Sequence, residues 1–239
     1  PAMKLNAIKL SLKQWFSAAI LVSLSAGAQS EILEVYRWQP TPGMGAQMLE
    51  TWRASKAIHE EAGAKVYAFQ GGVGTNLHVN YLMRWDSEAE WGASKDALAK
   101  SLAWQALWAK AGAENAATLQ WSMRVSNLDS SVKADSFDDG KVFSVFLWKP
   151  APGQTAKVMQ NFAKAKQIHT ALGARVESYL EGVGGVGNLH YTLAFKNWAA
   201  MAEFNQKLAN SKAWADLRAE IDPESSTLID SFTGSLMPL

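Results

Sequence analysis

The chain has 239 residues, a formal net charge of +1, four histidines, eleven tryptophans and no cysteine. The missing cysteine excludes disulfides, thiolate metal ligands and thiol chemistry. The near-neutral charge gives no sign of a nucleic-acid partner.

The first 28 residues have the pattern of a cleavable signal peptide. Lys4, Lys9 and Lys13 form a basic start, an apolar stretch too short to span a bilayer follows, and 26–28 has the small-x-small form of a cleavage site. Pro1 and Ala2 precede Met3, as in a cloning remnant. We expect a periplasmic or secreted protein that begins near residue 29 and has no stable membrane insertion after cleavage. An uncleaved membrane anchor is the alternative interpretation.

The rest of the chain repeats itself at a spacing of 110 to 112 residues. Residues 38–43 (WQPTPG) match 148–153 (WKPAPG), and SLAWQAL at 101–107 matches SKAWADL at 211–217. In this alignment His59 corresponds to His169 and His78 to His190. Self-similarity of this kind predicts two copies of one structural unit.

Each copy predicts the same order of elements. The first contains strands near 31–38, 64–69, 76–85 and 118–125, with helical regions near 45–61 and 87–111. The second contains strands near 141–148, 174–180, 188–195 and 227–233, with helical regions near 155–172 and 198–220. The order is βαββαβ in each copy, so the fold class is α+β. We place the repeats at 29–126 and 141–239, with a polar linker at 127–140. The glycine-rich segments 71–74 and 182–187 join two strands and open no helix, so we interpret them as hairpin turns and not as phosphate loops.

This element order and the SxAWxxL motif resemble the dimeric α+β barrel superfamily, with NIPSNAP-like, EthD-like and antibiotic-biosynthesis-monooxygenase-like proteins as the nearest groups. The resemblance covers both repeats. It implies two ferredoxin-like repeats that pair into one barrel within the chain, as a monomeric pseudo-dimer or a homo-oligomer of it. The superfamily includes oxygenases, haem-handling enzymes, isomerases and binding proteins, so the resemblance does not name a function.

Helical periodicity places His59 and His169 on the sheet-facing side of the first helix in each copy. On the third strand, His78 shares the polar face with Asn76 and Asn80, and His190 shares it with Asn188. If this face lies under the helix, His59 and His78 meet in one pocket; if it lines the barrel, they are separate. The histidines are candidate acid–base groups, and the other reading is a core imidazole bonded to a backbone group. The remaining candidate ligand-binding residues are Trp38, Trp52, Tyr67, Asn76, Trp148, Phe162, Tyr179 and Asn188.

Three functions are consistent with these residues. The first is an exported protein that binds a small apolar or aromatic molecule, with haem as one candidate, in one pocket per repeat. The second is a cofactor-independent oxygenase or isomerase that uses the histidines, and the third is a non-catalytic scaffold or assembly protein. No metal site is predicted, because Glu60 and Glu61 have no acidic counterpart in the second copy. Trp104 and Trp214 are interpreted as core or interface fillers.

Overall fold

The computed structural model describes residues 30–239, so the predicted signal peptide lies outside the described residues. Both copies have the predicted βαββαβ order, with the second helical region of each divided in two. The first half consists of β1 (Ile32–Pro40), α1 (Gly45–Glu61), β2 (Lys65–Gly71), β3 (Val79–Trp85), α2 (Glu88–Lys100), α3 (Leu102–Glu114) and β4 (Ala117–Asn127). The second half consists of β5 (Val142–Pro150), α4 (Thr155–Ala171), β6 (Arg175–Glu181), β7 (Leu189–Phe195), α5 (Trp198–Ala209), α6 (Lys212–Glu220), a short 3-10 helix (Pro223–Ser225) and β8 (Ser226–Leu236).

Serine caps explain why the long helical regions are divided. The Ser101 side chain accepts a hydrogen bond from the backbone N–H of Trp104 at 3.1 Å, and Ser211 does the same for Trp214 at 3.2 Å. A serine at this position satisfies an N–H group that a new helix leaves free. The repeated Ser-x-x-Trp pattern is therefore a helix start, and the helical regions predicted over 87–111 and 198–220 each consist of two helices.

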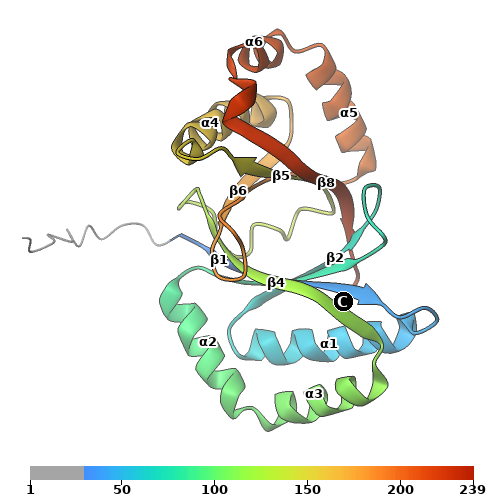
Figure 1. The fold of residues 1–239 in the computed structure, drawn as a ribbon. Helices are drawn as coiled ribbons and strands as arrows, with labels where there is room; N and C mark the ends of the chain where they lie inside the picture. Colours follow the sequence, from blue (N-terminus) through green and yellow to red (C-terminus); the bar gives the residue numbers. More distant parts are fainter. Residues whose placement is uncertain (1–29) are drawn as a thin grey trace, which may run out of the picture.

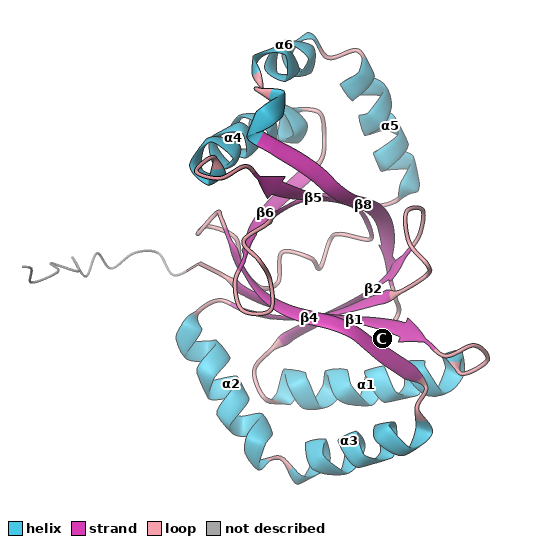
Figure 2. Cartoon of the chain, in the orientation of Figure 1, coloured by secondary structure: helices cyan, strands magenta, loops and turns pink. Residues whose placement is uncertain are grey.

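The strands form one closed barrel in the order β1-β3-β2-β8-β5-β7-β6-β4. Helices α1 to α3 cover the outside of one half, and α4 to α6 cover the outside of the other (Figures 1 and 2). The two halves meet where β2 pairs with β8 and where β4 pairs with β6, all antiparallel. The prediction of two ferredoxin-like repeats that close into a barrel within one chain is confirmed.

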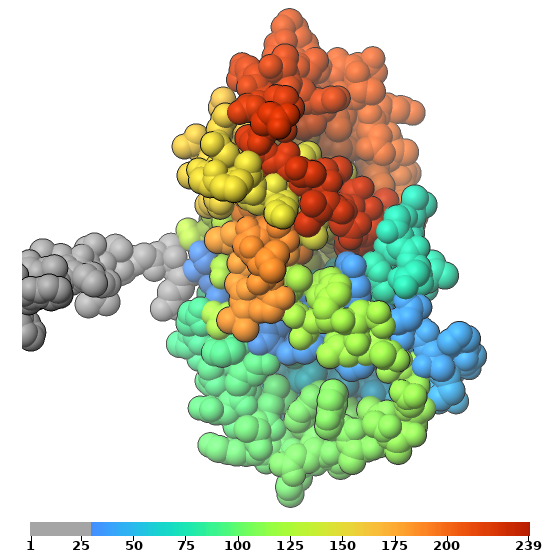
Figure 3. All heavy atoms as spheres, viewed as in Figure 1, coloured from blue at the N-terminus to red at the C-terminus, as the bar shows by residue number. Residues whose placement is uncertain are grey.

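The two glycine-rich turns are hairpins, and each crosses onto the other half. The hairpin between β2 and β3 lies against β8, and the one between β6 and β7 lies against β4, as the teal and orange segments in Figure 3 show. Gly74 and Gly184 have positive φ values of 88° and 85°, and a Cβ on either would collide with a backbone carbonyl, of Ser231 or Ser122. Only glycine permits both this backbone conformation and this close approach.

Strand alternation gives each half two separate faces. One face packs against the helices and carries Ile32, Val79 and Met83, whereas the other faces the barrel interior and carries Leu33 and Leu82. Because successive side chains point to opposite sides of a sheet, neighbouring residues belong to different layers. This alternation decides which of the predicted site residues can meet.

One end of the barrel contains a buried ionic network. Arg84 is fully buried, and it donates to Glu31 at 2.6 Å and to Glu177 at 2.9 Å. Ser136 of the linker donates to Glu177. The linker residue Phe137 is buried, and its ring centroid lies 3.9 Å from the guanidinium carbon of Arg84. The linker was expected to be polar. In the structure it also places the aromatic side chain of Phe137 in the barrel core.

Between residues 30 and 239, no helix combines the length and the apolar character that a membrane span requires.

Candidate functional site

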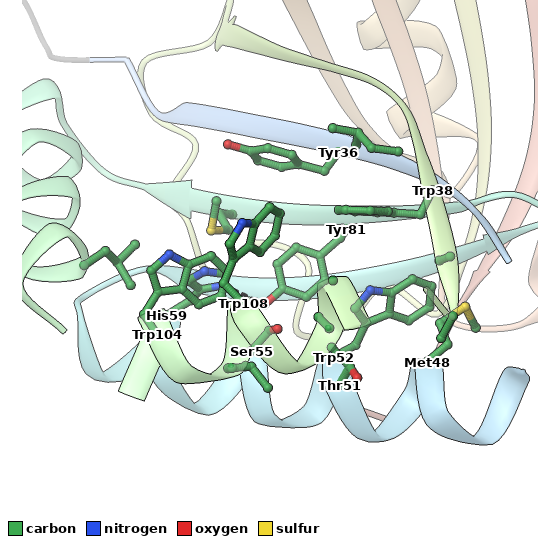
Figure 4. A pocket seen from close by; sticks show the side chains of 18 of the residues that line it. Tyr36, Trp38, Met48, Thr51, Trp52, Ser55, His59, Tyr81, Trp104 and Trp108 are labelled. Carbon is green, nitrogen blue, oxygen red and sulfur yellow. Dashed lines mark hydrogen bonds between the residues drawn. The ribbon is translucent and has the colours of Figure 1, made fainter. Parts of the chain in front are cut away.

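A cavity of about 760 Å³ lies between the sheet and the helices of the first half. Figure 4 shows that its labelled side chains come from strands β1 and β3 and from helices α1 and α3. The lining contains no aspartate or glutamate and one lysine. The aromatic members of the lining are Tyr36, Trp38, Trp52, Tyr81, Trp104 and Trp108.

His59 is a polar group of this cavity, and it lies toward one end of the labelled side chains in Figure 4. It lies in the last turn of α1, on the buried stripe that the periodicity predicted, together with Met48, Trp52 and Ser55. Its Nδ1 is 2.8 Å from the hydroxyl of Tyr81 on β3, and its ring centroid is 4.5 Å from that of Trp104. His59 and Tyr81 thus form a hydrogen-bonded pair under the roof of α3.

Burial sets the protonation of this pair. Burial lowers the pKa of His59 to about 4, helped by the positive charge of Lys95, so the imidazole is neutral at pH 7. Burial raises the pKa of Tyr81, which therefore keeps its proton. Within residues 30–239 the Tyr81 hydroxyl has no other hydrogen-bond partner, and we assign its proton to this bond, so that Tyr81 donates to Nδ1 of His59; the other tautomer, in which Nδ1–H donates to the hydroxyl, has the same geometry. In the assigned tautomer the imidazole proton lies on Nε2, which is a hydrogen-bond donor in a residue that lines the cavity.

The charged groups at the cavity wall are already satisfied. Glu34 is buried behind the wall and accepts hydrogen bonds from Lys95 at 2.5 Å, Trp91 at 2.7 Å and Tyr36 at 2.9 Å. Lys95, the lysine of the lining, is therefore occupied by a carboxylate with good geometry. The neutral polar groups that a ligand would meet among mostly apolar walls include the His59–Tyr81 pair and the side chains of Thr51, Ser55 and Asn115.

The second half repeats the pair but fills the space around it. Nδ1 of His169 is 2.8 Å from the Tyr191 hydroxyl, and Trp214 lies over the imidazole at 4.6 Å. Here the Phe204 ring also contacts His169, at 5.6 Å between centroids, and Nε2 of His169 is buried without a partner. The first half has Ser94 at the position of Phe204. Neither of the two cavities that we describe lies between the sheet and the helices of the second half.

The predicted site residues fall into three groups. Trp38, Trp52 and His59 line the cavity of the first half. Trp148, Phe162 and His169 lie in the packed layer of the second half, where the Phe162 ring is 4.9 Å from that of Tyr191. Asn76 is an exposed turn residue, and the remaining predicted residues lie on the barrel side of the sheet: Tyr67, His78, Tyr179, Asn188 and His190.

His59 and His78 do not share a pocket. Tyr81 faces the helices, so Asn80 and Leu82 beside it face the barrel, where both line a second cavity. His78 is on that same side, with its ring 5.3 Å from that of Phe232. Of the two arrangements left open by the sequence, the structure has the one in which the polar face of the third strand lines the barrel.

The correspondence between His78 and His190 was wrong. Trp38 pairs with Val79 in the first half, and Trp148 pairs with Leu189 in the second, so the offset in these strands is 110 residues. His78 therefore corresponds to Asn188, and His190 corresponds to Asn80. The turns have equal lengths, and an alignment that placed identical letters together introduced a shift of two residues that the strand register does not allow.

Sequence reasoning missed Tyr81, Trp104, Trp108 and Lys95 as cavity residues. Tyr81 was assigned to the apolar face of its strand, which is the face that lies under the helix. Trp104 was interpreted as a filler, but it contacts His59 and lines the cavity. The usable signal was that Tyr81 recurs as Tyr191 at the same offset as the two helix histidines.

Comparisons with known proteins agree on the fold. No protein-family model matches the chain, and no curated protein matches it. A candidate monooxygenase from Fusobacterium nucleatum superposes with a TM-score of 0.57 at 9% identity, over 87% of this chain and 92% of that one. An anthrone oxidase-like protein gives 0.52 at 10% identity, over 88% and 93%. A variant of DypB from Rhodococcus jostii, in complex with haem, gives 0.50 at 9% identity, over 88% and 94%.

The chain has the dimeric α+β barrel fold. Similarity at about a tenth of identical residues shows the architecture and nothing finer, and proteins of this fold include both oxygenases and haem-binding proteins.

Proposed function

We propose that this protein is exported and binds a planar, mostly apolar small molecule in the cavity of its first half. The ligand is expected to be aromatic and to carry a hydrogen-bond acceptor such as a carbonyl oxygen. The observation that carries the proposal is the neutral His59–Tyr81 pair in an aromatic cavity of about 760 Å³. Export rests on the leader sequence alone, and mass spectrometry of the exported protein is expected to give an N-terminus near Gln29.

The ligand class follows from the composition of the walls. Cavities of roughly 300–1,000 Å³ with apolar walls and a few placed polar groups are typical small-molecule sites. Indole and phenol rings such as those of Trp52, Trp104 and Tyr81 favour a flat aromatic partner through stacking and edge contacts. Nε2–H of His59 selects an acceptor, because a ligand that leaves this donor unpaired loses a hydrogen bond to water.

Haem is bound by one structural neighbour, but the cavity lining here has no free cation for its propionates. An axial imidazole coordinates iron through an unprotonated nitrogen and donates its other N–H to an acceptor. The Tyr81 hydroxyl can be that acceptor, so the His59–Tyr81 pair is itself compatible with an axial imidazole. Lys95, the lysine of the lining, is taken by Glu34 and is not free for a propionate.

Binding is a better conclusion than catalysis. The predicted acid–base partner of His59 was His78, which lies on the opposite face of the sheet. No carboxylate lines the cavity. A reaction at this site would depend on the His59–Tyr81 pair alone, with Nε2–H as the acid and the Tyr81 proton as its replacement. The cavity also argues against the scaffold interpretation for this surface, since a scaffold has no need of it.

The test uses two flat molecules of similar size. Alizarin is a three-ring quinone with carbonyl oxygens, and anthracene has three rings and no acceptor. Both are expected to quench tryptophan fluorescence on binding. His59→Phe is expected to weaken alizarin about threefold to tenfold, the value of one hydrogen bond, and to leave anthracene nearly unchanged.

His169→Phe is the matched control, because it alters the same pair in the half without the cavity. Ser55→Phe fills the cavity and is expected to abolish binding of both molecules. If alizarin binds His59→Phe and Ser55→Phe as tightly as the unmodified chain, the proposed site is wrong.

A further inference from the structure

A second cavity, of about 330 Å³, lies inside the barrel. Residues from all eight strands line it, and Arg37 and Asn80 point into it, whereas their neighbours Tyr36 and Tyr81 line the helix-side cavity. The thickness of the sheet therefore separates the two cavities. A ligand in the barrel would meet none of the residues that define the first site.

Arg37 is held in one orientation at the wall of this cavity. Its Nε donates to Oδ1 of Asn80 at 3.0 Å. Its guanidinium carbon lies 4.4 Å from the ring centroid of Trp121 and 5.0 Å from that of Phe232. Two aromatic rings and one hydrogen bond fix the plane of the guanidinium. Because the Arg37 side chain is already ordered, it would lose less conformational entropy when a partner binds.

The terminal nitrogens of Arg37 are not satisfied by the protein. Oδ2 of Asp230 is 4.0 Å from NH1, which is beyond hydrogen-bond distance, and the Asp230 side chain is 40% exposed. Within residues 30–239, no group accepts a hydrogen bond from NH1 or NH2 of Arg37. Burial lowers the pKa of Arg37 to about 10, so the group is still charged at neutral pH.

Besides Arg37 and Asp230, the cavity wall carries the charged residue Glu181, which has its own partners. Glu181 accepts from Nε2 of His190 at 2.9 Å and from the backbone N–H groups of Val186 and Asn188 at 2.9 and 3.1 Å. Its carboxylate is therefore closed by three donors and is not available to a cation. Arg37, in contrast, has only the long ion pair with Asp230 at 4.0 Å.

The barrel does not need this charge in order to close. Arg37 and Leu147 occupy equivalent positions, since Arg37 pairs with Asn80 and Leu147 pairs with His190. A leucine thus closes the same position in the second half without a charge. Burying a guanidinium costs free energy unless a partner offsets it, and Asp230 at 4.0 Å makes no hydrogen bond to it, so an arginine here indicates a further partner.

We propose that the barrel cavity binds a small monocarboxylate with an apolar body. The carboxylate would take the two terminal nitrogens of Arg37 side by side, a geometry that the flat guanidinium fork matches. The body would lie against the apolar part of the lining, which includes Val35, Leu82 and Val145. Asp230 competes with the ligand for Arg37, because it is the nearest carboxylate.

Isothermal titration calorimetry with benzoate and hexanoate tests the proposal. Both anions are expected to bind the unmodified chain. Arg37→Met is expected to weaken binding about tenfold or more, as the loss of charge-assisted hydrogen bonds implies, with Arg37→Lys intermediate. Asp230→Asn removes the competing carboxylate and is expected to tighten binding. A purely structural Arg37 would not produce this last effect.

A variant of the first site keeps the two proposals distinguishable. His59→Phe is expected to leave the binding of hexanoate, which has no aromatic ring, unchanged, whatever it does to alizarin. If Arg37→Met does not fold, two other variants test the proposal. Asp230→Asn is expected to bind the anions more tightly, and Val145→Phe, which fills the cavity, is expected to lose binding. The proposal is overturned if neither anion binds the folded chain, if Arg37→Met binds benzoate normally, or if these two variants leave binding unchanged.

Discussion

The two halves of this chain share a frame and differ in how they fill it. Both have the same strand register, and both place a histidine 2.8 Å from a tyrosine hydroxyl under a tryptophan. In the first half α3 contributes no buried residue and a cavity remains, whereas in the second half Leu217 of α6 and Phe204 of α5 are buried. The same polar pair is therefore accessible in one half and packed in the other.

This difference shows that a repeated motif does not imply a repeated site. Phe204 lies beside His169, and the smaller Ser94 stands at the equivalent position of the first half. The C-terminal part of α3 carries Ala111, and the equivalent residue of the second half is Ile221, which packs against the core of that half. A few changes in side-chain volume are enough to close a pocket without disturbing the strands around it.

The largest expected effect concerns the buried ionic network at the end of the barrel. Arg84 is fully buried between Glu31 and Glu177, whereas the equivalent position of the second half is Ala194. Arg84→Met strands two buried carboxylates, so we expect a loss of about 3–5 kcal/mol in the free energy of unfolding in urea. The control Arg124→Met removes a partly exposed pair with Glu88 and is expected to cost less than about 1 kcal/mol. Equal costs for the two variants would contradict the assigned role of the network.

The second expected effect is a loss of stability in mild acid. Burial lowers the pKa of both His59 and His169 to about 4, while an unfolded histidine titrates near pH 6.5. The unfolded state therefore binds protons first, and stability falls as the pH drops from about 6.5 to about 4. Each histidine contributes at most about 3 kcal/mol over this range. Urea unfolding at a series of pH values measures the slope, and His169→Gln is expected to reduce it.

Ligand binding sharpens this comparison of the two histidines. A carbonyl that accepts from Nε2–H of His59 favours the neutral imidazole, so alizarin should protect the chain against acid. The protection should be lost in His59→Phe and kept in His169→Gln. If alizarin has no effect on the acid transition of the unmodified chain, it does not contact His59.

How much of this the sequence predicts can be judged from particular residues. The repeat, the element order and the barrel were predictable, because strand and helix signals recur at matched positions. The inward position of His59 was also predictable, since a helix of 3.6 residues per turn places it on the stripe of Met48 and Trp52. The sheet-facing stripe follows from this periodicity, but the cavity does not, because the same stripe lies in a packed layer in the second half.

The partner of His59 was not predictable from periodicity alone. Strand alternation divides the third strand into two sets, but it does not say which set faces the helix, so only the set with His78 was considered and Tyr81 was missed. The polar face of a strand is usually expected to face solvent. In this closed barrel the polar face lines the interior and is buried as well. Asn80 and Arg84 are both buried there, and the histidine pairing failed in the same region because turn letters were aligned without strand register.

The third expected effect separates the two His–Tyr pairs by truncation. His169→Ala leaves the Tyr191 hydroxyl without a partner in a packed layer and is expected to cost about 1–3 kcal/mol. His59→Ala leaves the Tyr81 hydroxyl beside a cavity that water can enter, so we expect a smaller cost, below about 1 kcal/mol. Thermal and urea unfolding of both variants measure the difference. A larger loss at His59 than at His169 would reverse the assignment of open and packed halves.

The smallest expected effect lies in the two hairpins. Leu77 has a φ of 62° and Gly187, at the equivalent position, has 86°, so the first half places a side chain where the second has glycine. A left-handed conformation costs a non-glycine residue roughly 1–2 kcal/mol. Glycine avoids this cost, but its more flexible unfolded state lowers the stability of the folded chain and so cancels part of the gain. Because the Leu77 side chain is 59% exposed and packs little, Leu77→Gly is expected to stabilise the chain by up to about 1 kcal/mol. Gly187→Leu is expected to destabilise it by about 1–2 kcal/mol. Urea unfolding of the two single variants checks that the two changes in stability have opposite signs. A loss of stability in Leu77→Gly would contradict the prediction. It would mean that the packing of the Leu77 side chain stabilises the chain by more than its left-handed backbone costs.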